Sequence, residues 1–218
     1  MNEGGQDWRT KPTDRFVLKW IKVNLSARIT PLLAGRPWVR PGMITVISAG
    51  LGSLAGLVYG LGLGWTAGLL AGVAQVLDGV DGQLARLTGR ASPTGAFLDS
   101  VLDRYMDGAL IVGLIVYLVR LPLGWPVWSL LVLGTLALVG SSNVSYSTAR
   151  AETLSLDLGR PTLAAKGTRT TVMVLCAFFS LFWPPLPAAA LVYLAGHPNA
   201  AVIYRLVRVY RARGGRDA

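Results

Sequence analysis

Five of the eleven acidic residues in this 218-residue chain fall between positions 78 and 107. They are Asp78, Asp81, Asp99, Asp103 and Asp107, and the sequence around them is largely apolar. A carboxylate inside an apolar helix costs on the order of a few kcal/mol unless it is paired, protonated, bound to a metal or facing water. The clustering of five such residues therefore indicates a functional site.

The spacing of the first four aspartates predicts a metal site. Asp78 and Asp81 are three residues apart, and Asp99 and Asp103 are four apart, so each pair lies on one face of a helix. An antiparallel helical hairpin would bring the four carboxylates together, and two divalent cations would balance their charge. All-oxygen ligands favour Mg²⁺ or Mn²⁺, leave Ca²⁺ as an alternative and argue against zinc or copper. Asp107 lies one turn deeper, and the spacing does not define its role.

The single histidine and the single cysteine are not expected to add ligands. We expect His197 in the last loop, exposed to solvent, and Cys176 in simple apolar packing. One cysteine also excludes a disulfide within the chain.

The elements that hold the aspartates are predicted to be membrane-spanning helices. The chain is 52% hydrophobic and 15% charged, which is too apolar for an ordinary soluble domain. Six apolar windows are long enough to cross a hydrocarbon core of roughly 30 Å. They are residues 43–60, 66–85, 96–119, 127–148, 168–184 and 186–207. We therefore predict an all-α integral membrane fold with six transmembrane helices, and five remain an alternative because prolines interrupt the last two windows.

The basic residues predict the orientation in the membrane. The net charge is +10, and basic residues precede the first window and follow the second, fourth and sixth, whereas the opposite loops hold only Arg120. The positive-inside rule then places both termini in the cytoplasm and the aspartates at the cytosolic face of a multi-pass cell-membrane protein. Such flanks also suit anionic lipid headgroups, so nucleic acid is not expected as a partner.

Three segments are expected along the chain. Residues 1–42 form a cytosolic segment, in which residues 13–34 alternate basic and apolar positions as an interfacial amphipathic helix does. Residues 43–207 form the membrane domain, and residues 208–218 form a basic cytosolic tail. Glycines recur every four residues from Gly52 to Gly72, which predicts close packing of helices.

The aspartates belong to a longer pattern, Asp78-x2-Asp81-Gly82-x2-Ala85-Arg86-x8-Gly95-x3-Asp99-x3-Asp103. It has every fixed position of the signature of the CDP-alcohol phosphotransferase (CDP-alcohol phosphatidyltransferase) family, which the chain therefore resembles. Members transfer a phospho-alcohol group from a CDP-linked donor to a hydroxyl acceptor and release CMP. The resemblance implies a six-helix membrane fold, usually dimeric, that binds divalent metal.

The resemblance also implies roles for single residues. Asp78, Asp81 and Asp99 are expected to bind metal, and Asp103 resembles the general base that also contacts metal. The expected CDP-binding residues are Pro41, Thr45, Gly82, Ala85, Arg86 and Ser92. Many members have Asn or Asp after the proline, whereas this chain has Gly42, and Arg86 is also explained as a charge at the membrane boundary.

Two further stretches resemble one branch of the family, the di-myo-inositol phosphate phosphate synthases, which join CDP-inositol to inositol phosphate. They are residues 11–15 with residues 24–30, and residues 85–90 with residues 99–105. The alternative is a phospholipid synthase that uses CDP-diacylglycerol with inositol phosphate or glycerol phosphate. An ion-coupled transporter is a remote alternative, since buried carboxylates also line ion paths.

A phosphorylated acceptor needs cations beside the metal site. The candidates on the predicted cytosolic side are Arg104, Arg150, Lys166, Arg169, Arg205 and Arg208. Each of them is equally explained as a charge that orients the chain in the membrane.

Overall fold

The structure is a computed structural model that describes residues 8–10, 16–159 and 164–214, and these residues contain helices and no strand. The N-terminal helices are α1 (Phe16–Ile21), a π-helical turn η1 (Lys22–Ser26) and α2 (Ala27–Ala34). The long helices are α3 (Pro41–Gly60), α4 (Gly64–Leu87), α5 (Pro93–Val119), α6 (Val127–Thr153), α7 (Lys166–Phe178) and α8 (Pro187–Gly214), with a 3-10 turn η2 (Phe179–Leu181) after α7. The predicted all-helical fold is confirmed.

The last two predicted windows differ from the helices that occupy them. Window 168–184 was expected to cross the membrane, but α7 has 13 residues and is about 20 Å long. Pro184 and Pro185 cannot continue a helix, so the chain turns there. The predicted last loop around His197 was wrong, because α8 continues through Pro198 and His197 stacks on Tyr193.

Two helices in the described part of the chain, α3 and α6, are long and apolar enough to cross a membrane by length and composition alone. Helices α4 and α5 have 24 and 27 residues, but the aspartates make them more polar. The aspartates that indicate a site thus lower the mean hydropathy of the two helices that carry them.

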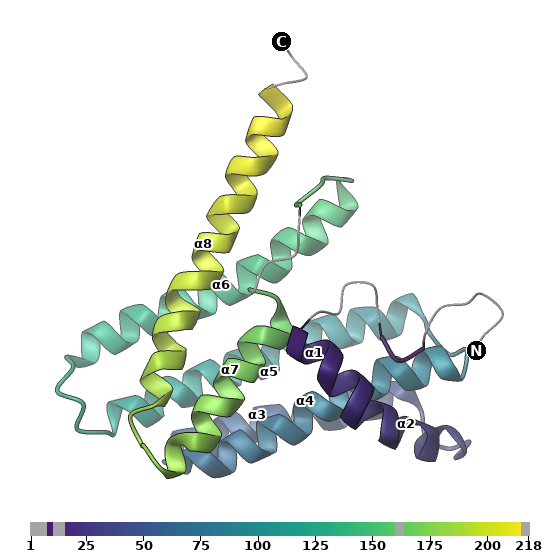
Figure 1. Ribbon diagram of the computed structural model, residues 1–218, viewed down its shortest axis with the longest axis horizontal. Coiled ribbons are helices and arrows are strands. Elements are labelled where there is room, and N and C mark those ends of the chain that lie inside the picture. Colours follow the sequence, from purple (N-terminus) through teal and green to yellow (C-terminus); the bar gives the residue numbers. More distant parts are fainter. Residues whose placement is uncertain (1–7, 11–15, 160–163, 215–218) are drawn as a thin grey trace.

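The contacts between the six long helices form a closed ring. Each helix contacts the next in the order α4, α3, α5, α6, α8 and α7, and α7 returns to α4. The apolar core between them includes Ala74, Ile111, Leu114 and Leu191. The far ends of α6 and α8 extend away from the layer of α3, α4 and α5 (Figure 1). This ring brings α4, α5 and the beginning of α7 together at one end of the molecule.

The N-terminal helices pack against α4 through a polar face. Lys22, Ser26 and Thr30 lie at four-residue steps and are buried. The Ser26 hydroxyl donates to the Val76 carbonyl at 2.8 Å, and the Thr30 hydroxyl donates to Gln83 at 2.7 Å. Apolar side chains on the other side, among them Trp20 and Leu32, are exposed. The interfacial position stays a prediction, and residues 11–15 lie outside the described residues.

Glycines permit direct backbone contact between α3 and α5, as the glycine spacing predicted. A Cβ atom on Gly56 would lie 2.3 Å from the Ala109 carbonyl oxygen, and one on Gly113 would lie 2.0 Å from the Gly56 carbonyl oxygen. Atoms do not approach so closely, so a larger residue at either position would separate the two helices.

Replacing Gly56 with alanine is expected to lower the free energy of unfolding by about 1–3 kcal/mol, because the added methyl group overpacks the contact. Gly50 is the matched control in the same helix, since a Cβ atom there meets nothing within 4 Å. Gly50→Ala is expected to stabilise by up to about 1 kcal/mol through helix propensity. Thermal unfolding in detergent measures both, and equal effects would contradict the packing argument.

Candidate active site

Three of the four predicted metal ligands converge where α4, α5 and the start of α7 meet. One carboxylate oxygen from each of Asp78, Asp99 and Asp103 lies within 4.8 Å of the other two. Oxygen donors at this separation fit a hard divalent cation such as Mg²⁺ or Mn²⁺. The predicted facing of the two aspartate-bearing helices is therefore found in the structure.

Lys166, the first residue of α7, lies among these carboxylates. Its ammonium group donates to Asp78 Oδ1 at 2.8 Å and also to Asp103 Oδ1. The sequence predicted Lys166 as a ligand for an acceptor phosphate, and the structure places it in direct contact with the predicted base. A cation here offsets the repulsion between neighbouring carboxylates.

Asp81, the fourth predicted ligand, lies outside the group of three. The Thr45 hydroxyl donates to Asp81 Oδ2 at 2.6 Å, and the Gly82 backbone N–H donates to Asp81 Oδ1. Asp81 still interacts electrostatically with Asp78 and Asp99. Two hydrogen bonds thus fix its carboxylate at the border between the aspartate cluster and an adjacent cavity.

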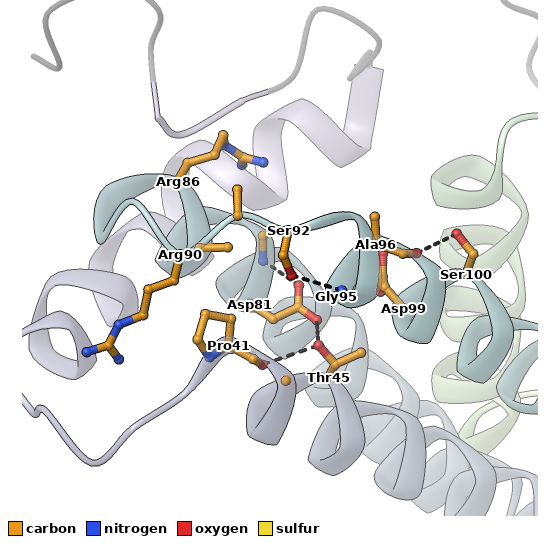
Figure 2. A pocket seen from close by; sticks show the side chains of 14 residues that line it. Pro41, Thr45, Asp81, Arg86, Arg90, Ser92, Gly95, Ala96, Asp99 and Ser100 are labelled. Carbon is orange, nitrogen blue, oxygen red and sulfur yellow. Dashed lines mark hydrogen bonds between the residues drawn. The ribbon is translucent and has the colours of Figure 1, made fainter. Parts of the chain in front are cut away.

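That cavity, of about 270 Å³, lies between the ends of α3, α4 and α5. Its lining includes all six residues predicted to bind CDP, namely Pro41, Thr45, Gly82, Ala85, Arg86 and Ser92. Asp81 and Asp99 line it too, so the nucleotide candidates and the aspartates share one site. Figure 2 shows Asp81 between Thr45 and Pro41 on one side and Ser92 and Gly95 on the other.

Local structure positions the polar groups around the cavity. The Ser92 side chain caps α5 by accepting a hydrogen bond from the Gly95 N–H at 3.1 Å. The Arg86 Nε donates to the Trp8 carbonyl at 2.9 Å. A Cβ atom on Gly82 would lie 3.4 Å from an Arg86 guanidinium nitrogen. The absence of a side chain at Gly82 therefore leaves space in the cavity beside this cation.

Asp107 joins α5 to α7, which answers a question that the spacing left open. Its Oδ2 lies 3.3 Å from an Arg169 guanidinium nitrogen and 3.4 Å from one of Arg104. Arg169 is only 2% exposed and also donates to the Ala164 carbonyl at 2.6 Å. Arg104 donates to the Ser145 hydroxyl at 2.6 Å. Asp107 therefore neutralises the buried Arg169 and the partly exposed Arg104 beside the aspartate cluster.

The structure separates the remaining predicted phosphate ligands. Arg205 donates through one nitrogen to the Val144 carbonyl and to two α6 hydroxyls, and it interacts electrostatically with Arg169. Arg208 pairs with Asp157 at 2.9 Å in the exposed loop after α6, where the Gly159 N–H and the Arg208 guanidinium lower the pKa of Asp157. Arg150 is exposed on α6. Arg104, Arg169 and Arg205 thus form one group near the site, and Arg208 belongs to a separate surface contact.

Comparison with known proteins identifies the family. The model of the CDP-alcohol phosphatidyltransferase family matches residues 38–204, which is most of the chain and includes the whole site. The chain belongs to the CDP-alcohol phosphatidyltransferase family. This is a family of integral membrane enzymes that depend on a divalent metal.

Curated family members with different names match the chain. A bifunctional IPC transferase and DIPP synthase of Thermococcus kodakarensis is 39% identical over 63% of this chain and 30% of its own length. A phosphatidylinositol phosphate synthase of Cutibacterium acnes is 31% identical over 91% of this chain and 98% of its own length. The chain spans less than half of the length of the bifunctional relatives that it matches, and about 30% of the first two.

Solved structures of a family member share the fold. The phosphatidylinositol phosphate synthase of Mycobacterium tuberculosis with CDP-DAG bound has a TM-score of 0.73 and 25% identity, over 85% of this chain and 94% of that chain. The same enzyme, solved with manganese and citrate, also has a TM-score of 0.73. The helical ring of this chain is thus the CDP-alcohol phosphatidyltransferase fold.

Several residues that line the cavity were not predicted from the sequence. They are Gly42, Arg90, Ala91, Gly95, Ala96 and Ser100, of which Gly95 was known only as a motif position. Arg90 could have been found, because it is a basic residue in the short turn between the two helices that carry the aspartates. Gly42 was noted only as a departure from the family pattern, and Ala91 carries no signal, since only the meeting of three helix ends brings it to the cavity.

Proposed function

We propose that this chain is a metal-dependent CDP-alcohol phosphotransferase that passes a phospho-alcohol group to a hydroxyl acceptor and releases CMP. One observation carries the proposal: the aspartate cluster and the residues predicted to bind CDP line one continuous site at the meeting point of α3, α4, α5 and α7. Family membership supports the same reaction class.

Asp78, Asp81, Asp99 and Asp103 would hold the metal, with Mg²⁺ or Mn²⁺, two per site, as the expected ions. Bound divalent metal would polarise the diphosphate and offset the charge that develops on the transferred phosphoryl group. The carboxylates of Asp78, Asp99 and Asp103 already lie close enough to share an ion. Asp81, which hydrogen bonds from Thr45 and Gly82 hold in place, would be the fourth metal ligand, on the side next to the cavity.

The cavity would hold the CDP part of the donor. Gly82 and Ala85 are small and leave room on the α4 side of the cavity. Arg86 and Arg90 would supply cations for the diphosphate. Thr45 would act indirectly, because its hydroxyl donates a hydrogen bond to the Asp81 carboxylate and so orients that carboxylate. Asp99 lies where the cavity meets the aspartate cluster.

Thr45 supplies a test of this arrangement. Thr45→Val removes the hydrogen bond to the Asp81 carboxylate and is expected to lower kcat/KM for the donor by about 10–100-fold, the size of a hydrogen bond to a charged group. Thr45→Ser keeps the hydroxyl and is expected to retain most of the rate. Measurement of CMP release checks both, and equal losses in the two variants would show that the hydroxyl is not the important group.

Asp103 would act as the general base. The acceptor oxygen would form a bond to the donor phosphorus, the bond from phosphorus to CMP would break, and the acceptor proton would pass to the Asp103 carboxylate. Lys166 contacts Asp103. An acceptor molecule whose phosphate group is held by Lys166 would therefore have its hydroxyl group close to the base. Arg104, Arg169 and Arg205 would supply further positive charge on this side.

The substrates follow from two kinds of relative. Relatives named DIPP synthase favour CDP-inositol with inositol phosphate, giving di-myo-inositol phosphate phosphate. Relatives named phosphatidylinositol phosphate synthase favour CDP-diacylglycerol with inositol phosphate, and one is solved with CDP-DAG bound. Both pairs share a phosphorylated polar acceptor, which suits the cations around Asp107. We put the DIPP synthase reaction first because of the resemblance at residues 85–105.

The six-helix ring would lie in the cell membrane with the N-terminal helices at its cytosolic surface. The exposed apolar side chains of α1 and α2 suit a lipid interface. Basic flanks place both termini and the site at the cytosol, where CDP-activated donors are made available. A homodimer is expected from the family resemblance, and the division into residues 1–42, 43–207 and 208–218 stays a prediction, since α8 continues to Gly214.

One substrate panel tests the proposed function. The purified full chain, with Mg²⁺, is offered CDP-inositol or CDP-diacylglycerol against inositol phosphate and glycerol phosphate, and CMP is measured. CMP release with a lipid-free product supports the DIPP reaction, and CMP release only with CDP-diacylglycerol supports the phospholipid synthase. The absence of CMP release with every pair would contradict the proposal.

A further inference from the structure

A second cavity, of about 310 Å³, lies at the end of the helical ring opposite the aspartates. It is formed where the α3–α4 turn, the end of α5 and the segment between α7 and α8 meet. Its lining includes Gly64, Trp65, Tyr117, Arg120, Ser180 and Leu181. None of these residues belongs to the site described above.

Arg120 is a cation without an anionic partner at this end. It ends α5, is exposed, and makes no side-chain hydrogen bond or ion pair with the residues that the structure describes. The sequence has no acidic residue between Asp107 and Glu152, between Asp14 and Asp78, or between Asp157 and Asp217. The turns around the cavity therefore supply no carboxylate for Arg120.

Local contacts hold the polar groups of the cavity in place. The Tyr117 hydroxyl donates to the Pro184 carbonyl at 3.1 Å, and the Tyr117 ring packs on Tyr59 with 5.0 Å between centroids. The Ser180 hydroxyl donates to the Ala177 carbonyl at 2.6 Å, which leaves its oxygen as an acceptor. A Cβ atom on Gly64 would lie 2.4 Å from the Ser180 oxygen, so glycine is needed for this close approach.

Apolar side chains continue from the cavity along the outside of the ring. Trp65, Leu69 and Val73 follow one another at four-residue steps on α4 and are all exposed. Leu175 on α7 and Leu181 on η2 are exposed as well, and α4 packs against α7. Trp65 and Leu181 line the cavity, so exposed apolar side chains continue from it along two helices that pack together.

Tryptophans mark this end of the ring as a membrane interface. Four of the seven tryptophans lie in or beside its turns, and all four are exposed: Trp65, Trp125, Trp128 and Trp183. Tryptophan gathers at the level of the lipid headgroups, because its ring is apolar and its N–H is polar. An arginine among interfacial tryptophans is well placed to meet a lipid phosphate.

We propose that this cavity binds one anionic phospholipid from the leaflet opposite the aspartate site. The lipid phosphate would pair with the Arg120 guanidinium, and its acyl chains would lie on the apolar surface of α4 and α7. The absence of acidic residues in these turns favours a headgroup with net negative charge over a zwitterionic one.

Native mass spectrometry of the full chain in detergent, with added phosphatidylglycerol or phosphatidylcholine, tests the proposal. We expect one phosphatidylglycerol to be retained, and about a tenfold loss of its affinity in Arg120→Gln, which removes a charge-assisted contact. Leu121 also lines the cavity, and Leu121→Trp, which keeps the Arg120 charge and fills the cavity, is expected to cause a similar loss. Arg211→Gln removes an exposed arginine from the other end and is expected to leave retention unchanged.

Four results would overturn the proposal. Equal retention of phosphatidylglycerol by the wild type and by Arg120→Gln would exclude Arg120 as the ligand. Equal retention of phosphatidylglycerol and phosphatidylcholine would exclude a preference for an anionic lipid. A rise in melting temperature with inorganic phosphate alone that equals the rise with phosphatidylglycerol would exclude recognition of the lipid as a whole. A loss of dimer mass in Arg120→Gln, with unchanged lipid retention, would assign the surface to a second copy of the chain.

Discussion

Replacing Asp103 with asparagine is expected to slow CMP release by about 10²–10⁴-fold, the usual contribution of a general base. The asparagine has nearly the same shape but cannot accept the proton of the incoming hydroxyl. Asp103 is well suited to this role, because its carboxylate lies within reach of Asp78 and Asp99 and contacts Lys166. The rate is measured as CMP formed in a single turnover.

The matched control for Asp103 is Asp157→Asn. Asp157 lies in an exposed loop and, among the residues that the structure describes, pairs with the surface residue Arg208 and the Gly159 backbone. Its replacement is expected to leave CMP release unchanged. If Asp103→Asn keeps the wild-type rate at saturating metal and substrate, Asp103 is not the base.

Replacing Asp107 with leucine is expected to destabilise the fold by about 3–5 kcal/mol, the cost of removing one partner from a buried ion pair. The change would leave the Arg169 guanidinium, which is 2% exposed, without its carboxylate. Since this pair joins α5 to α7, the start of α7 and Lys166 should lose their position. Thermal unfolding in detergent measures the loss of stability.

A double variant separates the charge effect from a packing effect. Asp107→Leu with Arg169→Met removes both charges and keeps the volume, so it is expected to be more stable than Asp107→Leu alone. Asp157→Asn breaks an exposed ion pair and is expected to change the free energy of unfolding by less than about 1 kcal/mol. Additive losses in the double variant would contradict the proposed pairing.

The sequence predicted the parts of the site that depend on spacing within one helix. Asp78 and Asp81, or Asp99 and Asp103, share a helix face by geometry, and the turn between α4 and α5 makes the two faces meet. The CDP-binding candidates also gathered in one cavity, because they lie near the ends of α3, α4 and α5. The aspartate pairs need only local helix geometry and one hairpin, whereas the CDP-binding candidates came from the family resemblance and need the start of α3 as well.

Contacts between distant helices could not be predicted in the same way. Lys166 is 88 residues from Asp78, and nothing in its surroundings indicates that α7 begins at the aspartates. The pairing of Asp107 with Arg169 likewise depends on how the ring closes. The short α7 was missed, because apolar composition continues through Phe182 and Trp183 although the helix does not.

The dependence of CMP release on free divalent metal tests the central claim most directly. We expect no CMP above background in EDTA and recovery of CMP release on titration with Mg²⁺ or Mn²⁺. We expect Asp99→Asn to need a higher metal concentration for half-saturation, because the Asp99 carboxylate belongs to the aspartate cluster. Full CMP release in EDTA, or an identical metal titration for Asp99→Asn and the wild type, would contradict the central claim.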